Sequence, residues 1–300
     1  MTEEKNKWVK YGSIFAIVIM LVSAVLVGLM YLGDDSTDFA EYPLKNIKGT
    51  HTDFTFKNAK DGVKYLPEGV LGISILKVYP GDNISESLNA SFPGVVFDKV
   101  MVGSYAEGMV EYYSVEENNN GSIVLQGKPK YDEYNGYNIV ITNPAQRAIV
   151  GDPIIIASFY NYVTDNKLGR KVVDVIAGKA SGATNLNDIL SYADDTDVFD
   201  EIIVFKANNG SDYDKYYQRS SQSGTGILQM EAIFLSPNED VKESVRAFEK
   251  NASESVTVAV TENGPALKIN ITTSDYIGYL TEMQKLNKLV SDHTVQSSSA

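Results

Sequence analysis

The stretches NISESLNASFPGVVFDKVMV (residues 83–102) and NLNDILSYADDTDVFDEIIV (residues 185–204) align without a gap, and they decide the fold prediction. Six aligned positions are identical, three of them consecutive: Val96-Phe97-Asp98 matches Val198-Phe199-Asp200. We interpret the match as an internal duplication of a unit of about 100 residues. Two copies are too few for a solenoid, so the repeat predicts two similar domains.

The similarity extends beyond these stretches in both directions. Upstream, residues 70–77 fall over residues 172–179 in the same register. Downstream, after a shift of two positions, Tyr112-Tyr113 fall over Tyr216-Tyr217. Adjacent tyrosines in a strand point to opposite faces of a sheet, so at most one of each pair can line a shared surface. We expect the chain's many tyrosines mainly to fill half-exposed sheet positions, with an aromatic contact surface as the alternative.

The second copy has the clearer pattern of helices and strands. Alternating β-branched residues predict strands, and apolar residues three or four apart predict helices. Strands are expected at 171–177, 199–207, 213–220 and 226–236, with a hairpin at 256–260 and 266–271; helices are expected at 185–193, from about 238, and from 275 to 290.

These elements predict an α+β fold in which two similar, mainly antiparallel sheet units carry helices on one face, with ferredoxin-like variants as one option. The predicted segments are a cytoplasmic tail (1–13), a transmembrane anchor (14–32), a stalk (33–57), a first α+β unit (58–166), a second α+β unit (167–290) and a disordered tail (291–300).

The transmembrane prediction rests on nineteen consecutive residues, IFAIVIMLVSAVLVGLMYL (14–32). As a helix they span roughly 28 Å, close to the hydrocarbon thickness of a bilayer. Three lysines precede the run and Asp34 and Asp35 follow it, which predicts a cytoplasmic N-terminus and an extracytoplasmic C-terminal region. A cleaved signal peptide is the alternative, and it exports the same region.

Composition excludes several classes of function. The chain has 39 acidic and 26 basic side chains, a formal net charge of −13, and no cysteine. Such a surface repels phosphate, so no nucleic-acid partner is expected. Disulfides and thiolate metal sites are excluded because no thiol is present.

Several familiar catalytic motifs do not occur in the sequence. The GxSxG, HExxH, P-loop and GxGxxG patterns are all missing, and the two histidines, His51 and His293, have no partner at metal-ligand spacing. We therefore expect no catalytic residues and no cofactor, with Ca²⁺ as the one alternative. Its candidate ligands are the acidic residues Asp194, Asp195, Asp197 and Asp200, although their spacing is not that of an EF-hand and favours an acidic surface loop instead.

Six Asn-x-Ser/Thr sequons are candidate glycosylation sites in an exported protein: Asn83, Asn89, Asn120, Asn209, Asn251 and Asn270.

Three segments, residues 48–69, 108–116 and 127–140, resemble uncharacterised single-pass membrane-anchored surface proteins of methanogenic archaea. The resemblance agrees with an acidic ectodomain that lacks cysteine. It implies no activity, cofactor or site residue.

The sequence thus predicts a membrane-anchored extracytoplasmic module that serves in binding or as an envelope-associated scaffold, without catalysis. Its expected partners are the membrane, through residues 14–32, and another envelope protein or a second copy of the chain. Two alternatives stay open: an exported hydrolase with its site between the two units, and a calcium- or carbohydrate-binding surface module.

Overall fold

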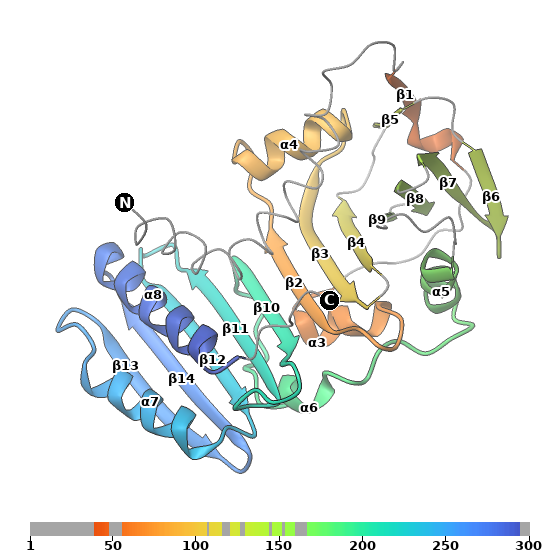
Figure 1. Cartoon of the computed structure of the whole chain (residues 1–300). Helices are drawn as coiled ribbons and strands as arrows, with labels where there is room; N and C mark the ends of the chain where they lie inside the picture. Colours follow the sequence, from red (N-terminus) through yellow and green to blue (C-terminus); the bar gives the residue numbers. More distant parts are fainter. Residues whose placement is uncertain are drawn as a thin grey trace, which may run out of the picture. The chain divides into compact units, whose positions relative to one another are not determined.

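The computed structural model describes residues 39–47, 56–106, 108–115, 121–126, 130–143, 146–151, 154–159 and 167–294. It forms two compact units: unit 2 holds Lys57–Asp61, Gly72–Ser74 and the chain from Thr184 onward, and unit 1 holds the rest. Both are built from mainly antiparallel sheets with a few helices, so the α+β prediction is confirmed (Figure 1).

No helix among the described residues is long and apolar enough to cross a membrane. The predicted anchor at 14–32 lies outside them.

Unit 1 contains a sheet with the strand order β2-β3-β4-β9-β8-β7-β6 and a separate antiparallel pair, β1 with β5. The strands are β1 (Phe39–Pro43), β2 (Gly72–Lys77), β3 (Phe97–Tyr105), β4 (Gly108–Val115), β5 (Ser122–Gln126), β6 (Lys130–Tyr134), β7 (Tyr137–Asn143), β8 (Gln146–Gly151) and β9 (Ile154–Phe159). The helices are η1 (Leu44–Asn46), α3 (Ala59–Gly62), η2 (Val63–Tyr65), α4 (Asn83–Ser91) and α5 (Lys167–Ile176). Helix α3 and strand β2 each contain residues of both units.

An aromatic cluster lies in the core of unit 1. The rings of Phe92, Phe97 and Tyr113 lie with centroids 5.2 to 5.4 Å apart, at the distances that aromatic pairs favour. Leu88 of α4 is buried in the same core. Helix α4 begins at the cap residue Asp82, whose Oδ1 accepts a hydrogen bond from the Ser85 amide at 2.6 Å.

The predicted stalk is wrong for residues 39–47. Strand β1 pairs with β5 over its whole length, and Ile47 is buried in the core that contains Phe92. The acidic flank of this segment suggested a linker, but its apolar residues Tyr42, Leu44 and Ile47 pack against unit 1.

The strand predicted at 171–177 is also wrong, because residues 171–176 belong to helix α5 and residue 177 lies in the turn that follows it. Leu168, Val172 and Val173 are buried, at a spacing that places them on one face of a helix. The β-branched run around Val172 indicated a strand, and tertiary packing overrides that weak preference. Helix α5 falls within unit 1, so unit 2 resumes at Thr184 rather than at the predicted boundary of 167.

Unit 2 contains a five-stranded antiparallel sheet in the order β13-β14-β12-β11-β10. Its elements are α6 (Asn187–Leu190), β10 (Glu201–Lys206), β11 (Lys215–Gln222), β12 (Leu228–Leu235), α7 (Glu239–Lys250), β13 (Thr257–Asn263), β14 (Ala266–Thr273) and α8 (Tyr276–Asp292). The hairpin and the two long helices fall where the sequence predicts them. The unit is not ferredoxin-like, because three consecutive strands, β10, β11 and β12, precede α7, and this is not the β-α-β-β-α-β order of that fold.

Helices cover both faces of the unit 2 sheet. α7 and α8 lie side by side across one face (Figure 1), and α6 packs against β11 and β12 on the other. The expectation that helices cover one face alone is therefore wrong for this unit. The adjacent residues Tyr216 and Tyr217 point to opposite faces and both are buried, so they fill the core rather than form a contact surface.

The disordered tail predicted from residue 291 is wrong for its first four residues. Helix α8 continues to Asp292 and is capped by His293, and Thr294 Oγ1 donates a hydrogen bond to the Val290 carbonyl at 2.6 Å. Residues 295–300 lie outside the described part of the chain.

A buried carboxyl group lies in strand β4 of unit 1. Glu111 is 2% exposed, the Tyr113 hydroxyl donates a hydrogen bond to its Oε2, and its Oε1 has no partner among the described residues. Burial raises the pKa of Glu111 from 4.5 to about 8, and the hydrogen bond from Tyr113 opposes that rise only in part. The folded chain therefore keeps this group protonated at neutral pH.

This raised pKa predicts a pH-dependent stability for unit 1. The folded state holds a proton that the unfolded state releases above pH 4.5, so the stabilisation is complete below that pH and is lost as the pH rises through about 8. Denaturant unfolding between pH 5 and 8 should show the free energy of unfolding falling by up to roughly 1.4 kcal/mol per pH unit from this group. Glu111→Gln should remove that slope, and Glu133→Gln at an exposed position of the same unit should keep it. An unchanged slope in Glu111→Gln would contradict the assignment.

Candidate functional site

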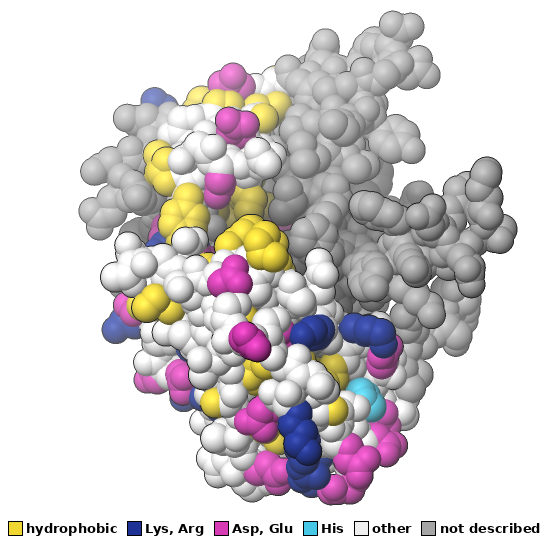
Figure 2. Space-filling model, turned by 90° about the vertical axis from the view of Figure 1, so that its left-hand side faces the viewer, with side chains coloured by type: hydrophobic (Ala, Val, Ile, Leu, Met, Phe, Trp, Pro, Cys, Tyr) yellow, Lys and Arg dark blue, Asp and Glu magenta, His cyan; other side chains and the backbone are white. Residues whose placement is uncertain are grey.

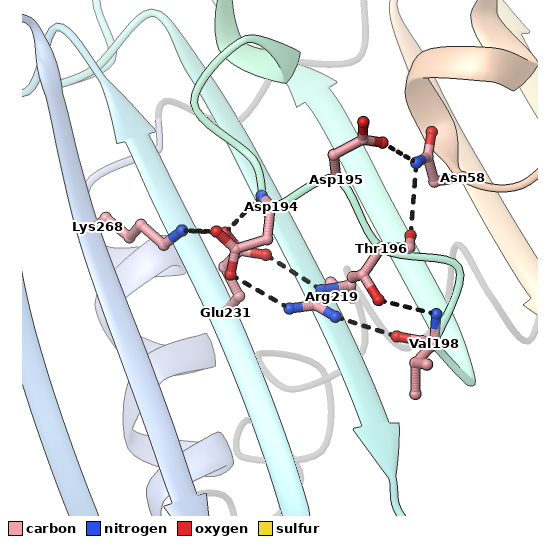
Figure 3. A network of polar contacts seen from close by, with 8 residues as sticks. All are labelled: Asn58, Asp194, Asp195, Thr196, Val198, Arg219, Glu231 and Lys268. Carbon is pink, nitrogen blue, oxygen red and sulfur yellow. Dashed lines mark hydrogen bonds and ion pairs between the residues drawn. The ribbon is translucent and has the colours of Figure 1, made fainter.

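The four aspartates predicted as calcium ligands lie in the segment between α6 and β10, and Figure 3 shows two of them, Asp194 and Asp195. Their carboxylates do not converge on one point. Asp194 Oδ1 accepts from Lys268 Nζ at 2.7 Å, Asp195 Oδ1 accepts from Asn58 Nδ2 at 3.0 Å, and Asp200 Oδ2 accepts from the Gln222 amide at 2.6 Å. Asp197 is exposed. In the described part of the chain, no three acidic or histidine side chains are placed to hold a metal ion.

A buried glutamate on β12 holds this segment in place. Glu231 is 1% exposed, and its carboxylate accepts from Arg219 Nε at 3.1 Å, from Lys268 Nζ at 2.5 Å and from the Asp194 amide at 3.0 Å. Arg219 lies directly opposite Glu231 on the neighbouring strand, and its Nη1 also donates to the Val198 carbonyl at 3.0 Å. Both carboxylate oxygens are thus satisfied, as a buried charge requires.

Lys268 belongs to the same network. Desolvation disfavours its charged form, but hydrogen bonds to Asp194 and Glu231 outweigh that effect and raise the pKa of Lys268.

A hollow beside the network, between Asn58, Leu190 and Tyr217, has a volume of about 10 Å³. It has room for about one water molecule, so this cluster stabilises the fold and offers no space for a ligand.

A larger cavity lies at the loop between β10 and β11. Its volume is about 410 Å³, within the range of small-molecule sites, and we call it the loop cavity. Its wall carries charges of both signs together with amide and hydroxyl groups, contributed among others by Asp188, Lys206, Asn208, Asn209, Ser211 and Lys215. Lys215 forms an ion pair with Asp188 in that wall.

Three side chains that the sequence did not bring together meet on the α7/α8 side of unit 2. His293 Nδ1 lies 2.7 Å from Asp212 Oδ2, and His293 Nε2 lies 3.0 Å from Ser244 Oγ. We call this group the Ser244–His293–Asp212 relay. No local pattern indicated a partner for His293, because the three residues lie far apart in the sequence and come from different elements. His51, the other histidine, lies outside the described residues.

The sequons differ in accessibility. Asn83, Asn89, Asn209 and Asn251 are exposed, and Asn270 is half-buried in β14. Asn120 lies outside the described residues. Glycosylation stays a prediction at all six, and Asn209 stands out because it also lines the loop cavity.

Comparison with known proteins gives no match: no family model, no curated protein and no solved structure is similar to this chain.

The network around Glu231 predicts a large loss of stability when its charge is removed. Glu231→Gln leaves Arg219 and Lys268 without their shared carboxylate, and breaking such a buried pair costs about 3 kcal/mol. Denaturant unfolding should show this loss, whereas Asp197→Asn, an exposed change in the same segment, should stay within about 0.5 kcal/mol of the unmodified chain. Equal stability of the two variants would show that Glu231 does not fix this segment.

Proposed function

We propose that the chain is a membrane-anchored extracytoplasmic binding module whose ligand site is the loop cavity. The observation that carries the proposal is the cavity itself, whose volume of about 410 Å³ suits a small ligand. The anchor is inferred from the apolar run at 14–32 and from the charges on either side of it. Binding at this site requires no chemical step.

The wall of the cavity favours a neutral, polar ligand. Two acidic side chains, Asp188 and Asp214, are balanced by two basic ones, Lys206 and Lys215, in a chain that is otherwise strongly acidic. On the face shown in Figure 2, acidic and basic side chains are likewise interspersed. Amides and hydroxyls in the wall can both donate and accept hydrogen bonds. A saccharide, whose hydroxyl groups do the same, matches this chemistry.

The loop that forms the cavity is held in shape before any ligand binds. Gly210 has a φ of 88°, a conformation open to glycine, within a turn closed by the hydrogen bond from the Ser211 amide to the Asn208 carbonyl at 3.1 Å. Further along the loop, the Asp212 amide donates to the His293 carbonyl at 3.0 Å. A wall fixed in this way lowers the entropic cost of binding.

The test measures where the chain lies in the cell and whether it binds saccharides there. Intact cells that express the full chain are incubated with a panel of fluorophore-labelled neutral oligosaccharides that cannot cross membranes, and the proposal predicts saturable binding that stays with the membrane fraction. Asn209→Gln should weaken binding about 3- to 10-fold, because the longer side chain moves the amide out of its place in the wall. Asn89→Gln also removes an exposed sequon, but in unit 1, and should bind like the unmodified chain.

Two results would overturn the proposal. One is the absence of binding to intact cells across the whole panel. The other is a native chain that mass spectrometry finds fully glycosylated at Asn209, because the glycan would occupy the cavity.

A further inference from the structure

The Ser244–His293–Asp212 relay has the geometry of an activated nucleophile. Asp212 lies in the loop between β10 and β11, Ser244 lies on α7, and His293 caps the end of α8. The carboxylate is 2.7 Å from Nδ1 of the imidazole, and the hydroxyl is 3.0 Å from Nε2. Hydrolases place a serine, its general base and the group that orients the base in this order and at these distances.

Each member of the relay is held in position. The second oxygen of Asp212, Oδ1, accepts from Asn238 Nδ2 at 2.7 Å, and the Asp212 carbonyl accepts from the Asn238 amide at 2.8 Å. Asn238 is itself fixed as the cap of α7, because its Oδ1 accepts from the Val241 amide at 3.1 Å. The imidazole is 14% exposed, so it keeps its orientation and can still reach solvent.

The hydrogen bonds also fix which ring nitrogen carries the proton. A carboxylate accepts only, so Nδ1 of a neutral imidazole donates to Asp212 and Nε2 accepts from the Ser244 hydroxyl. This is the arrangement that allows His293 to take the proton of Ser244.

We propose that Ser244 is a nucleophile for acyl transfer, with His293 as its general base and Asp212 as the residue that orients the base. Ser244 Oγ bonds to the acyl carbon of an ester while its proton passes to His293 Nε2. The bond from carbon to the leaving oxygen then breaks, and that oxygen takes the proton from Nε2. Water hydrolyses the acyl-serine by the same transfers in reverse, which releases the acid and restores the hydroxyl.

The position of Ser244 limits the class of substrate. It lies in the interior of α7, where backbone N–H groups are used in the hydrogen bonds of the helix and cannot form an oxyanion hole. Without such donors, the site suits esters with good leaving groups, such as aryl esters, and not amides. This activity is separate from binding in the loop cavity, and either proposal can fail without the other.

The test measures the reactivity of Ser244 in the full chain with a fluorophosphonate probe. Attack by Ser244 Oγ breaks the phosphorus–fluorine bond, and mass spectrometry then locates the labelled serine. Ser87 is an internal control, because it is also a half-buried helical serine but donates to the Asn83 carbonyl at 2.7 Å instead of facing an imidazole. We expect Ser244 to be labelled at least about 100-fold faster than Ser87, the usual contribution of a general base.

Variants and pH separate catalysis from structure. Ser244→Ala should abolish the labelling and the hydrolysis of p-nitrophenyl acetate at this site. His293→Gln should slow both by about 100-fold or more. In the unmodified chain, labelling should rise with pH as the imidazole loses its proton, a readout that does not depend on whether a variant folds. Labelling of Ser244 no faster than that of Ser87, or a rate that does not change with pH, would overturn the proposal.

Discussion

Burial of the central strand β12 on both faces of the sheet is the constraint on which the rest of unit 2 depends. Every residue of β12 except Gln229 is buried, so segments from both sides must pack against this strand. With no cysteine in the chain, these segments can be fixed only by packing and by polar contacts. On one face the Glu231 carboxylate binds the segment that follows α6. On the other face, Tyr213, Tyr216 and Phe234 pack with ring centroids 5.0 to 6.4 Å apart beneath the helices.

The same constraint explains how the relay forms. Helix α8 has to cover one face of the sheet, and its last turn therefore ends beside the loop between β10 and β11. There the Asp212 amide meets the His293 carbonyl, and the two side chains meet as well. The residues that complete the packing of the unit thus also bring an imidazole to a serine hydroxyl. The loop cavity shares this loop, so its wall is fixed by the contacts that position His293.

Local patterns predicted a good part of the fold. The hairpin of β13 and β14 follows from alternation around Gly264-Pro265, and α7 and α8 follow from helical spacing and from their caps, Asn238 and Asp275. The aligned stretches that suggested a duplication each contain a helix followed by a strand, α4 with β3 and α6 with β10. Upstream of them the alignment fails, because 70–77 contains strand β2 whereas 172–179 contains the end of helix α5. Downstream it holds for the two tyrosine pairs, which lie in β4 and β11, the strands that pair with β3 and β10.

The errors arose where distant parts of the chain decide the outcome. The Val172 region satisfies both strand and helix patterns, and only its packing selects the helix. No local signal marks Glu231 as buried, because its partners Arg219 and Lys268 come from neighbouring strands.

His293 was predicted to be a tail residue for the same reason, since Asp212 and Ser244 lie far away in the sequence. The acidic residues between 194 and 200 were candidate ligands only because they cluster in the sequence, and the structure directs Asp194, Asp195 and Asp200 to separate partners.

The position of His293 between Asp212 and Ser244 is the central claim, and nitrogen NMR of the full chain labelled with ¹⁵N-histidine tests it most directly. The chain has only two histidines, so the two imidazoles can be assigned with one variant, His51→Gln. The structure predicts that the neutral ring of His293 carries its proton on Nδ1, with Nε2 as the acceptor, although a free imidazole side chain favours a proton on Nε2. It further predicts that Asp212→Asn abolishes this preference. A His293 ring that carries its proton on Nε2, or that averages between the two forms like a solvated side chain, would contradict the account.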